Sequence, residues 1–275
     1  MTNKKTYKNH TEIARKIRAK VVEMSHNAQA SHLASSLSCI DILVALLWGL
    51  MKLDPKQPED PARDRLILSK GHAAQALYAS LAYRGYFKLD ELSQYNQNGG
   101  SMPEHPGPHS APGVEAATGS LGHGLSIAAG ISLAAKINKF DYNTYVVLGD
   151  GECNEGSIWE AALFASTQKL GNLNVVIDFN KWQGTGRSTE IMSINPFREK
   201  WQSFGWNAID CDGHSIDEII ASISNPKHTS DKPTAVIAHT KKGKGVSFME
   251  DDNNWHYRIP NEHEVALALR ELGVK

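Results

Sequence analysis

Oxygen-bearing side chains follow two short apolar segments of this chain. Asp150 comes directly after the apolar residues 145–148, and Asn180 directly follows residues 174–179. Both segments have the length and composition of buried parallel strands, whose carboxyl ends meet at one edge of a sheet, where ligands bind. Carboxylate, amide and carbonyl oxygens are the usual ligands of Mg²⁺ and Ca²⁺. We therefore expect Asp150 and Asn180 to hold a divalent cation, with a backbone carbonyl of residues 181–183 as a possible third ligand.

The turn around Asp150 indicates which anion accompanies this cation. Gly149 and Gly151 allow a tight turn and close approach of a ligand, and the helix that follows points its amides at an anion. Residues 145–168 contain four acidic side chains and no Lys or Arg, so a phosphate alone would be repelled. A diphosphate bridged by the cation fits. A GDG turn alone is common and Asn180 alone suits a strand-end cap; the pair of strand ends favours a ligand site.

The elements that must position these residues alternate between strand and helix along the chain. The sequence predicts strands at 65–69, 145–148, 174–179, 206–210 and 234–239, and helices at 13–24, 40–50, 73–83, 128–135, 158–169, 196–204 and 216–224. This order predicts an α/β fold: an open, mostly parallel sheet with helices on both faces, as one domain spanning residues 1–275. Residues 97–124 are rich in Gly, Pro, Ser and His, and so long a segment without regular structure is often functional.

Composition and motifs exclude several classes of function. The 275 residues are 41% hydrophobic with a formal net charge of -1 and no long basic cluster, which argues against nucleic-acid binding. No apolar run is long enough for a membrane span. Three widely spaced cysteines and a polar N-terminus favour the cytoplasm. The motifs of P-loop, dinucleotide-binding, serine-hydrolase and zinc-protease proteins are all missing.

Five segments, in order, together resemble the N-terminal part of transketolase. They are SKGHAAQALY (69–78), EHPG with GVEAATGSLGHG (104–124), GDGECNEG (149–156), DFNKWQGTG (178–186) and KKGKGVSFMEDDNNWH (241–256). The resemblance covers nearly the whole chain and implies the thiamine-diphosphate-binding domain of the PP type. It implies thiamine diphosphate and Mg²⁺ (or Ca²⁺) as cofactors.

The resemblance also implies a role for individual residues. The metal would be held by Asp150, Asn180 and the carbonyl of Trp182. The cofactor would be contacted by His72, Gly119, Ser120, Leu121, Gly149, Gly151, Asn180 and His256. The implied catalytic residues are His32, His105, His256 and Glu155. His32 and His105 would line the substrate channel, His256 would reach toward the diphosphate and the reacting sugar, and Glu155 would meet a catalytic glutamate of a partner across an interface.

The implied reaction is transfer of a two-carbon ketol unit from a ketose phosphate to an aldose phosphate, a transketolase-type transfer (EC 2.2.1.-). Full-length transketolases are more than twice as long as this chain and contain a pyrimidine-binding domain that is missing here. The resemblance therefore implies a partner, a C-terminal transketolase subunit, in an α2β2 heterotetramer.

Some positions depart from the family pattern and keep alternatives open. The residues after His32 are Leu33-Ala34-Ser35, closer to deoxyxylulose-phosphate synthase, and Ser120 replaces a proline. One alternative is another thiamine-diphosphate carboligase subunit, such as one resembling deoxyxylulose-phosphate synthase or a 2-oxoacid dehydrogenase. Another is a non-catalytic scaffold relative. Pyruvate consumption would identify the first, and failure to bind the cofactor the second.

Overall fold

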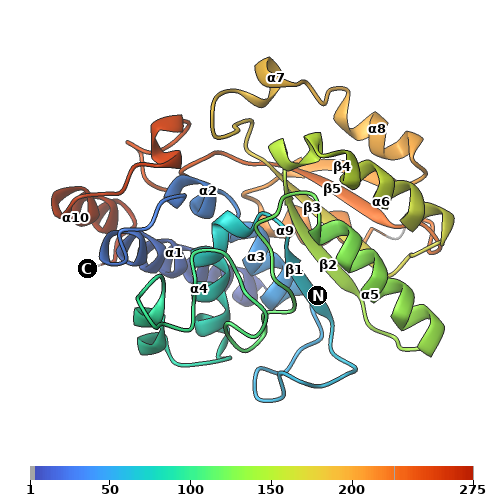
Figure 1. The fold of residues 1–275 in the computed structure, drawn as a ribbon, viewed down its shortest axis with the longest axis horizontal. Coiled ribbons are helices and arrows are strands. Elements are labelled where there is room, and N and C mark those ends of the chain that lie inside the picture. Colours follow the sequence, from blue (N-terminus) through green and yellow to red (C-terminus); the bar gives the residue numbers. More distant parts are fainter. Residues whose placement is uncertain (1–3, 226, 275) are drawn as a thin grey trace.

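A five-stranded, wholly parallel sheet forms the centre of the molecule (Figure 1). The computed structural model describes residues 4–225 and 227–274, so the ends of the predicted 1–275 domain and Pro226 lie outside the described residues. The strand order is β1-β2-β3-β5-β4. The strands are β1 (Arg65–Leu68), β2 (Thr144–Gly149), β3 (Leu173–Phe179), β4 (Asn207–Asp212) and β5 (Thr234–His239).

Helices cover both faces of the sheet and pack on two separate hydrophobic cores. The first core is formed with α1 (Lys4–Asn27), α2 (Leu33–Ser38), α3 (Ile40–Val44), α4 (Ala74–Arg84), α9 (Ile216–Ile223) and α10 (Glu262–Glu271). The second is formed with α5 (Gly124–Asn138), α6 (Gly156–Thr167) and α8 (Phe197–Ser203). Side chains of β2 alternate between the cores, with Val147 in the first and Val146 in the second, because successive strand residues point to opposite faces. The predicted fold class is confirmed.

Several elements differ from the sequence prediction. The predicted helix 40–50 is α3 followed by a π-helical turn, Ala45–Leu50. Strand β4 begins and ends later than the predicted 206–210. Helix α2 was not predicted because it is only six residues long and wholly buried, and three of the six are serine, so its polar residues do not mark a solvent-facing side. Helix α10 was missed although Asn261 and Glu264 form a capping box at its start.

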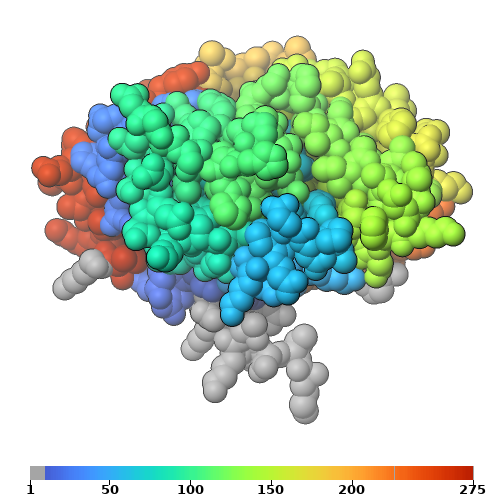
Figure 2. Space-filling view, turned by 60° about the horizontal axis from the view of Figure 1, so that its bottom comes forward, coloured from blue at the N-terminus to red at the C-terminus, as the bar shows by residue number. Residues whose placement is uncertain are grey.

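The strand register brings the predicted ligands to one edge of the sheet. Gly149 pairs with Asp178 at the ends of β2 and β3, so Asp150 and Asn180 lie just beyond the last paired residues. The long segment 97–124 contains no helix or strand until α5 begins. Figure 2 shows this segment (green) spread over one surface beside α5.

Large apolar side chains remain exposed on the outer helices. Ile137 on α5 and Leu163 and Phe164 on α6 are exposed, and the two helices contact each other. We call this surface the α5–α6 face. Within the described ranges, no helix combines the length and apolar character needed to cross a membrane.

Candidate active site

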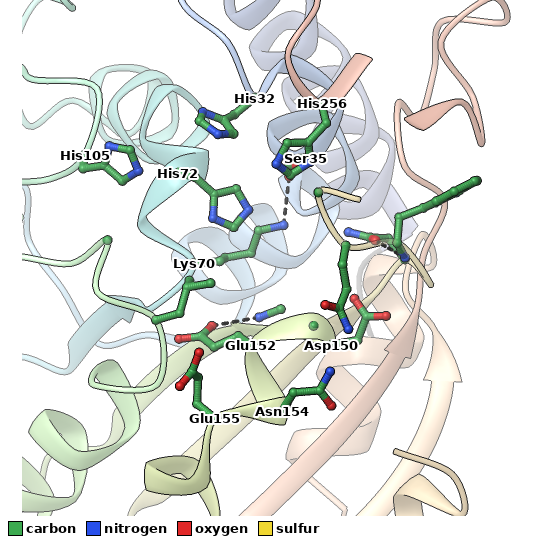
Figure 3. Close-up of a pocket in the computed structure, with 18 of the residues that line it drawn as sticks. His32, Ser35, Lys70, His72, His105, Asp150, Glu152, Asn154, Glu155 and His256 are labelled. Carbon is green, nitrogen blue, oxygen red and sulfur yellow. Dashed lines mark hydrogen bonds between the residues drawn. The ribbon is translucent and has the colours of Figure 1, made fainter. Parts of the chain in front are cut away.

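A cavity of about 390 Å³ opens at the carboxyl ends of the central strands (Figure 3). Its lining includes twelve of the predicted residues: His32, His72, His105, Gly119, Leu121, Gly149, Asp150, Gly151, Glu155, Asn180, Trp182 and His256. Ser120 is exposed and is not among the lining residues. The fold thus brings together segments that are far apart in the sequence. The volume of the cavity lies within the range of small-molecule binding sites.

Asp150 is a buried carboxylate at the floor of this cavity, 1% exposed. It accepts hydrogen bonds from the backbone N–H of Lys181 (3.1 Å) and from Ser188 Oγ (2.6 Å). Among the described residues no cationic side chain forms an ion pair with it, and burial raises its pKa to about 6. A bound divalent cation would compensate this charge, so the residue fits the metal-binding role.

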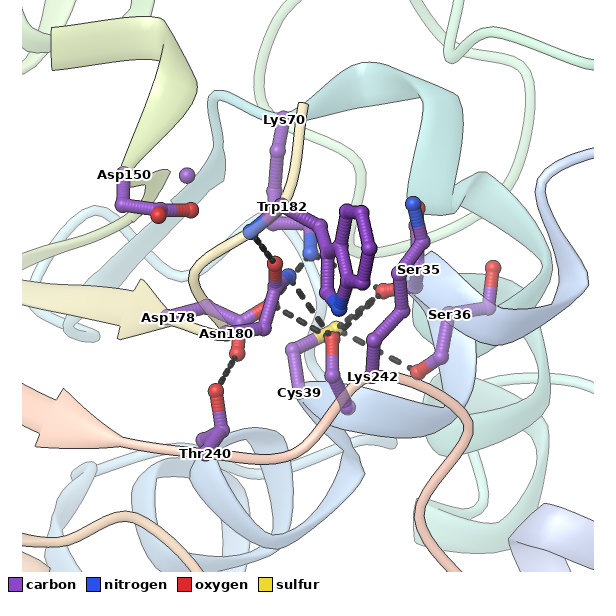
Figure 4. Close-up of polar contacts among 12 residues, drawn as sticks. Ser35, Ser36, Cys39, Lys70, Asp150, Asp178, Asn180, Trp182, Thr240 and Lys242 are labelled. Carbon is purple, nitrogen blue, oxygen red and sulfur yellow. Dashed lines mark hydrogen bonds and ion pairs between the residues drawn. The ribbon is translucent and has the colours of Figure 1, made fainter. Parts of the chain in front are cut away.

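Asn180 lies on the neighbouring strand tip, within a hydrogen-bond network (Figure 4). Its Oδ1 accepts from the backbone N–H of Trp182 at 3.0 Å, and its Nδ2 donates to Asp178 Oδ2 at 3.2 Å. These contacts fix the amide so that the oxygen faces the loop that follows. The donor set of carboxylate, amide and backbone carbonyl oxygens is the hard-oxygen chemistry that Mg²⁺ and Ca²⁺ require.

Lys70 and Asp178 form a buried ion pair that the sequence did not predict. Lys70 also donates to the carbonyl of Ser35 at 2.9 Å, and Asp178 accepts from Ser38 and Thr240. Burial opposes both charges, but the pair raises the pKa of Lys70 and lowers that of Asp178. The charge count over residues 145–168 was therefore an incomplete description of the site, because Lys70 lines the same cavity. Its charge is paired with Asp178, so at Asp150 it offsets only part of the rise in pKa that burial causes.

Glu152, one of the four acidic residues in the segment 145–168, connects two glycine-rich segments. Its carboxylate accepts backbone N–H groups from Gly149 and Gly122, both at 3.0 Å, and the hydroxyl of Ser69. Burial raises its pKa, and these donors oppose the rise. Glu152 therefore holds the turn of Asp150 against the segment that contains Gly119.

Close contacts explain three glycines of the site: Gly71 lies against backbone, and Gly119 and Gly151 lie against side chains. A Cβ on Gly71 would lie 2.6 Å from the backbone N of Gly119. Gly119 itself has φ +131°, and a Cβ there would lie 2.8 Å from Cδ2 of His105. A Cβ on Gly151 would lie 2.7 Å from Cγ of Gln183. At these positions any side chain would displace neighbouring groups of the cavity.

Four imidazoles line one side of the cavity (Figure 3). The ring centroid of His32 lies 5.4 Å from that of His72, 5.9 Å from that of His105 and 5.1 Å from that of His256. His32 has φ 65°, in the left-handed region, and its backbone N–H donates to the carbonyl of His256 at 2.8 Å. This bond holds the start of α2 against the segment before α10.

Neighbouring side chains give His32 and His256 opposite proton positions. Ser31 Oγ donates to Glu104 at 2.8 Å, so it accepts from Nδ1–H of His32 at 2.9 Å and leaves Nε2 as an acceptor. Lys242 Nζ donates to Nδ1 of His256 at 2.9 Å, which leaves Nε2–H as a donor.

Burial keeps three of these imidazoles, those of His32, His72 and His256, neutral near pH 7. Burial lowers the pKa of His32 and lowers that of His72 well below its ordinary value. Burial and the nearby Lys242 lower the pKa of His256 to about 3. A cluster of displaced pKa values in a cavity is typical of an active site.

Comparisons with known proteins agree with this geometry. Residues 9–275 match the family model described as transketolase, thiamine diphosphate binding domain. An apulose-4-phosphate transketolase subunit from Phocaeicola vulgatus is 40% identical over 94% of this chain and 92% of its own length. The 6-deoxy-6-sulfo-D-fructose transketolase subunit SqwG of Clostridium sp. is 42% identical over 93% of both chains.

Solved structures show the same fold. The transketolase of Campylobacter jejuni superposes with a TM-score of 0.92 and 29% identity over 100% of this chain. The match covers 44% of the Campylobacter protein, so the chain corresponds to less than half of that transketolase. This chain therefore belongs to the transketolase family and contains that family's thiamine-diphosphate-binding domain.

Proposed function

We propose that this chain is the diphosphate- and metal-binding subunit of a two-chain transketolase. The observation behind this proposal is the placement of Asp150 and Asn180 at adjacent strand tips in one cavity, where the buried Asp150 carboxylate lacks a cationic partner among the described residues. Asp150, Asn180 and the carbonyl of Trp182 would hold Mg²⁺ (or Ca²⁺). The cofactor diphosphate would lie against Gly149, Gly151 and His72.

Thiamine diphosphate, when bound, supplies the carbon nucleophile that takes a two-carbon ketol unit from a ketose and passes it to an aldose. The histidines of this chain would handle the protons of the sugar hydroxyls. His32 Nε2 would accept a proton and His256 Nε2–H would donate a hydrogen bond, since both rings are neutral near pH 7. His105 would position the sugar in the same cavity. Gly119, Ser120 and Leu121 would lie along the rings of the cofactor.

The partner would be a C-terminal transketolase subunit that carries the pyrimidine-binding domain. Two relatives of nearly the same length are named as transketolase subunits, and the exposed apolar α5–α6 face offers a surface for a second chain. Glu155 lines the cavity and would meet the catalytic glutamate of the partner. The assembly would be an α2β2 heterotetramer. A cytoplasmic location would suit the three buried cysteines, which are all free thiols.

The substrates would be a ketose phosphate donor and an aldose phosphate acceptor. The names of the relatives, which mention apulose-4-phosphate and a sulfofructose, support a sugar with an anionic terminus. A ketol-transfer assay on the purified chain, with and without a candidate partner encoded by a neighbouring gene, tests the proposal. We expect activity only in the mixture with thiamine diphosphate and Mg²⁺. Full activity of the isolated chain would refute the two-chain proposal, and pyruvate consumption with carbon dioxide release would indicate a different carboligase.

A further inference from the structure

The loop of residues 180–188 carries two of the proposed metal ligands and closes on itself. Asn180 begins it, and the carbonyl of Trp182 lies within it. The backbone N–H of Gln183 donates to the carbonyl of Gly186 at 2.8 Å, and the backbone N–H of Ser188 donates to the carbonyl of Lys181 at 3.1 Å. The direction of the Trp182 carbonyl therefore depends on the conformation of this short hairpin.

The sequence at the tip of this loop allows many backbone conformations. Gly184 and Gly186 are two positions apart, and glycine has the greatest backbone freedom of any residue. The carbonyl of Trp182, which lies next to this tip, has a defined position only where other groups fix the loop. One tie is the bond from Asn253 Nδ2 to the carbonyl of Gly184, at 3.1 Å.

A second and stronger tie connects the loop to the segment before His256. Asp251 Oδ1 accepts from Trp182 Nε1 at 2.8 Å and from Arg187 Nη1 at 2.7 Å. Asp251 Oδ2 accepts from Arg187 Nη2 at 2.7 Å, which makes the pair bidentate. The guanidinium carbon of Arg187 lies 3.7 Å from the centre of the Trp182 ring, a cation–π contact. These three residues form what we call the Trp182–Arg187–Asp251 cluster.

The cluster joins both strands of the hairpin to one fixed carboxylate. Trp182 and Arg187 face each other across the hairpin as an isolated antiparallel bridge. Asp251 has φ 60°, and its backbone N–H donates to the carbonyl of Lys242 at 2.9 Å, so its own position is set by the segment that follows β5. The side chain of Asp251 is 49% exposed, so a stabilising role alone would be small for a surface pair.

We propose that Arg187 and Asp251 are positioning residues that hold the loop of residues 180–188 in the conformation that binds the divalent cation. This inference rests on the proposed function, because it takes the Trp182 carbonyl and Asn180 as ligands. The pair would act without touching the cation. Asp251 fixes Trp182 on one side of the hairpin and Arg187, which precedes Ser188, on the other. Ser188 Oγ in turn donates to Asp150 Oδ2, so the third ligand is oriented through the same loop.

The test is titration of the assembled enzyme with Mn²⁺ in the presence of thiamine diphosphate, with free Mn²⁺ followed by electron paramagnetic resonance. Asp251→Asn is the main variant, since Asn tolerates φ > 0 and still accepts from Trp182 while losing the ion pair. We expect a Mn²⁺ dissociation constant about 10- to 100-fold higher, as for other residues that orient metal ligands. Arg187→Lys should weaken binding similarly, because Lys cannot make the bidentate, stacked contact.

A matched control is available in the same chain. Arg258 stacks on Trp255, at 4.3 Å, and pairs with Glu264 without touching the loop. Glu264→Gln should leave Mn²⁺ affinity at the wild-type value. Equal losses in Glu264→Gln and Asp251→Asn would overturn the inference, as would a Mn²⁺ affinity of Asp251→Asn that matches wild type.

Asp150→Asn separates this inference from the proposed function. Wild-type affinity in Asp150→Asn, or no Mn²⁺ binding by the wild-type enzyme, would refute the metal site itself. Strong loss in Asp150→Asn with no loss in Asp251→Asn would refute only the positioning role. A lower melting temperature of apo Asp251→Asn without a change in affinity would assign the pair to stability and refute the positioning role too.

Discussion

Lys242 Nζ donates to Nδ1 of His256 over 2.9 Å, and it also donates to Asn253 Oδ1 at 2.6 Å. Burial lowers the pKa of Lys242 to about 7, with the nearby charge of Lys70 as a further cause. An amine whose pKa is lower in the folded than in the unfolded state lowers the free energy of unfolding when the pH is low enough for it to be protonated. The ionisation of Lys242, which contacts the predicted catalytic residue His256, therefore makes protein stability depend on pH.

Replacing this amine should change how stability depends on pH. The unfolded chain binds more protons than the folded chain between pH 7 and about 10.5, so the contribution of Lys242 to the free energy of unfolding rises with pH across this window. Lys242→Met should flatten this rise and increase the free energy of unfolding at pH 6, because the cost of burying the charged amine is removed. Urea unfolding at pH 6 and pH 9 measures it, with exposed Lys241→Met as the control. A Lys242→Met chain less stable than wild type at pH 6 would contradict the expectation.

His256→Asn should lower kcat/KM for ketol transfer by about 10²- to 10⁴-fold in the assembled enzyme, because a positioned proton-handling group is lost. Since the pKa of His256 is about 3, its titration should produce no change in rate between pH 5 and pH 8. The pH–rate profile of the wild-type enzyme measures this. His263→Asn, on exposed α10, serves as the control. A loss below tenfold would remove His256 from the proposed machinery.

Lys70→Met should lower the free energy of unfolding by about 3 to 5 kcal/mol, because Asp178 would remain as a buried and unpaired charge. The double variant Lys70→Met/Asp178→Leu should recover most of that loss, since both charges are removed together. Urea unfolding of the two variants gives the comparison. If the double variant is as unstable as the single one, the hydrogen bonds of Asp178 matter more than its charge.

Gly119→Ala should lower the free energy of unfolding by about 1 to 3 kcal/mol, since φ +131° excludes a side chain and the new methyl would meet His105. The affinity for thiamine diphosphate should fall with it, as measured by calorimetry with Mg²⁺ and the partner. Gly130→Ala is the opposite case. Nothing lies within 4 Å of a Cβ at this mid-helix position of α5, so this change should stabilise the chain by about 0.5 to 1 kcal/mol. Equal effects of the two changes would contradict both explanations.

The sheet was predictable from sequence because each strand is a short apolar run between helical patterns. The positions of Asp150 and Asn180 followed from the same pattern, since strand tips of a parallel sheet share an edge. The roles of Lys70 and Glu152 were not predictable, because their partners, Asp178 and the backbone of Gly122, come from other segments. Sequence periodicity also cannot reveal a helix such as α2, which is buried on every side.

The close approach of Gly71 to the backbone of Gly119 restricts how the cavity can be redesigned. A mutant library that varies Gly71 would consist mainly of misassembled cavities, because any side chain there would meet the backbone of Thr118 and Gly119. Variation is better directed at Tyr257, which lines the same cavity and is 63% exposed. There, a change in side-chain size alters the entrance while the cofactor floor keeps its shape.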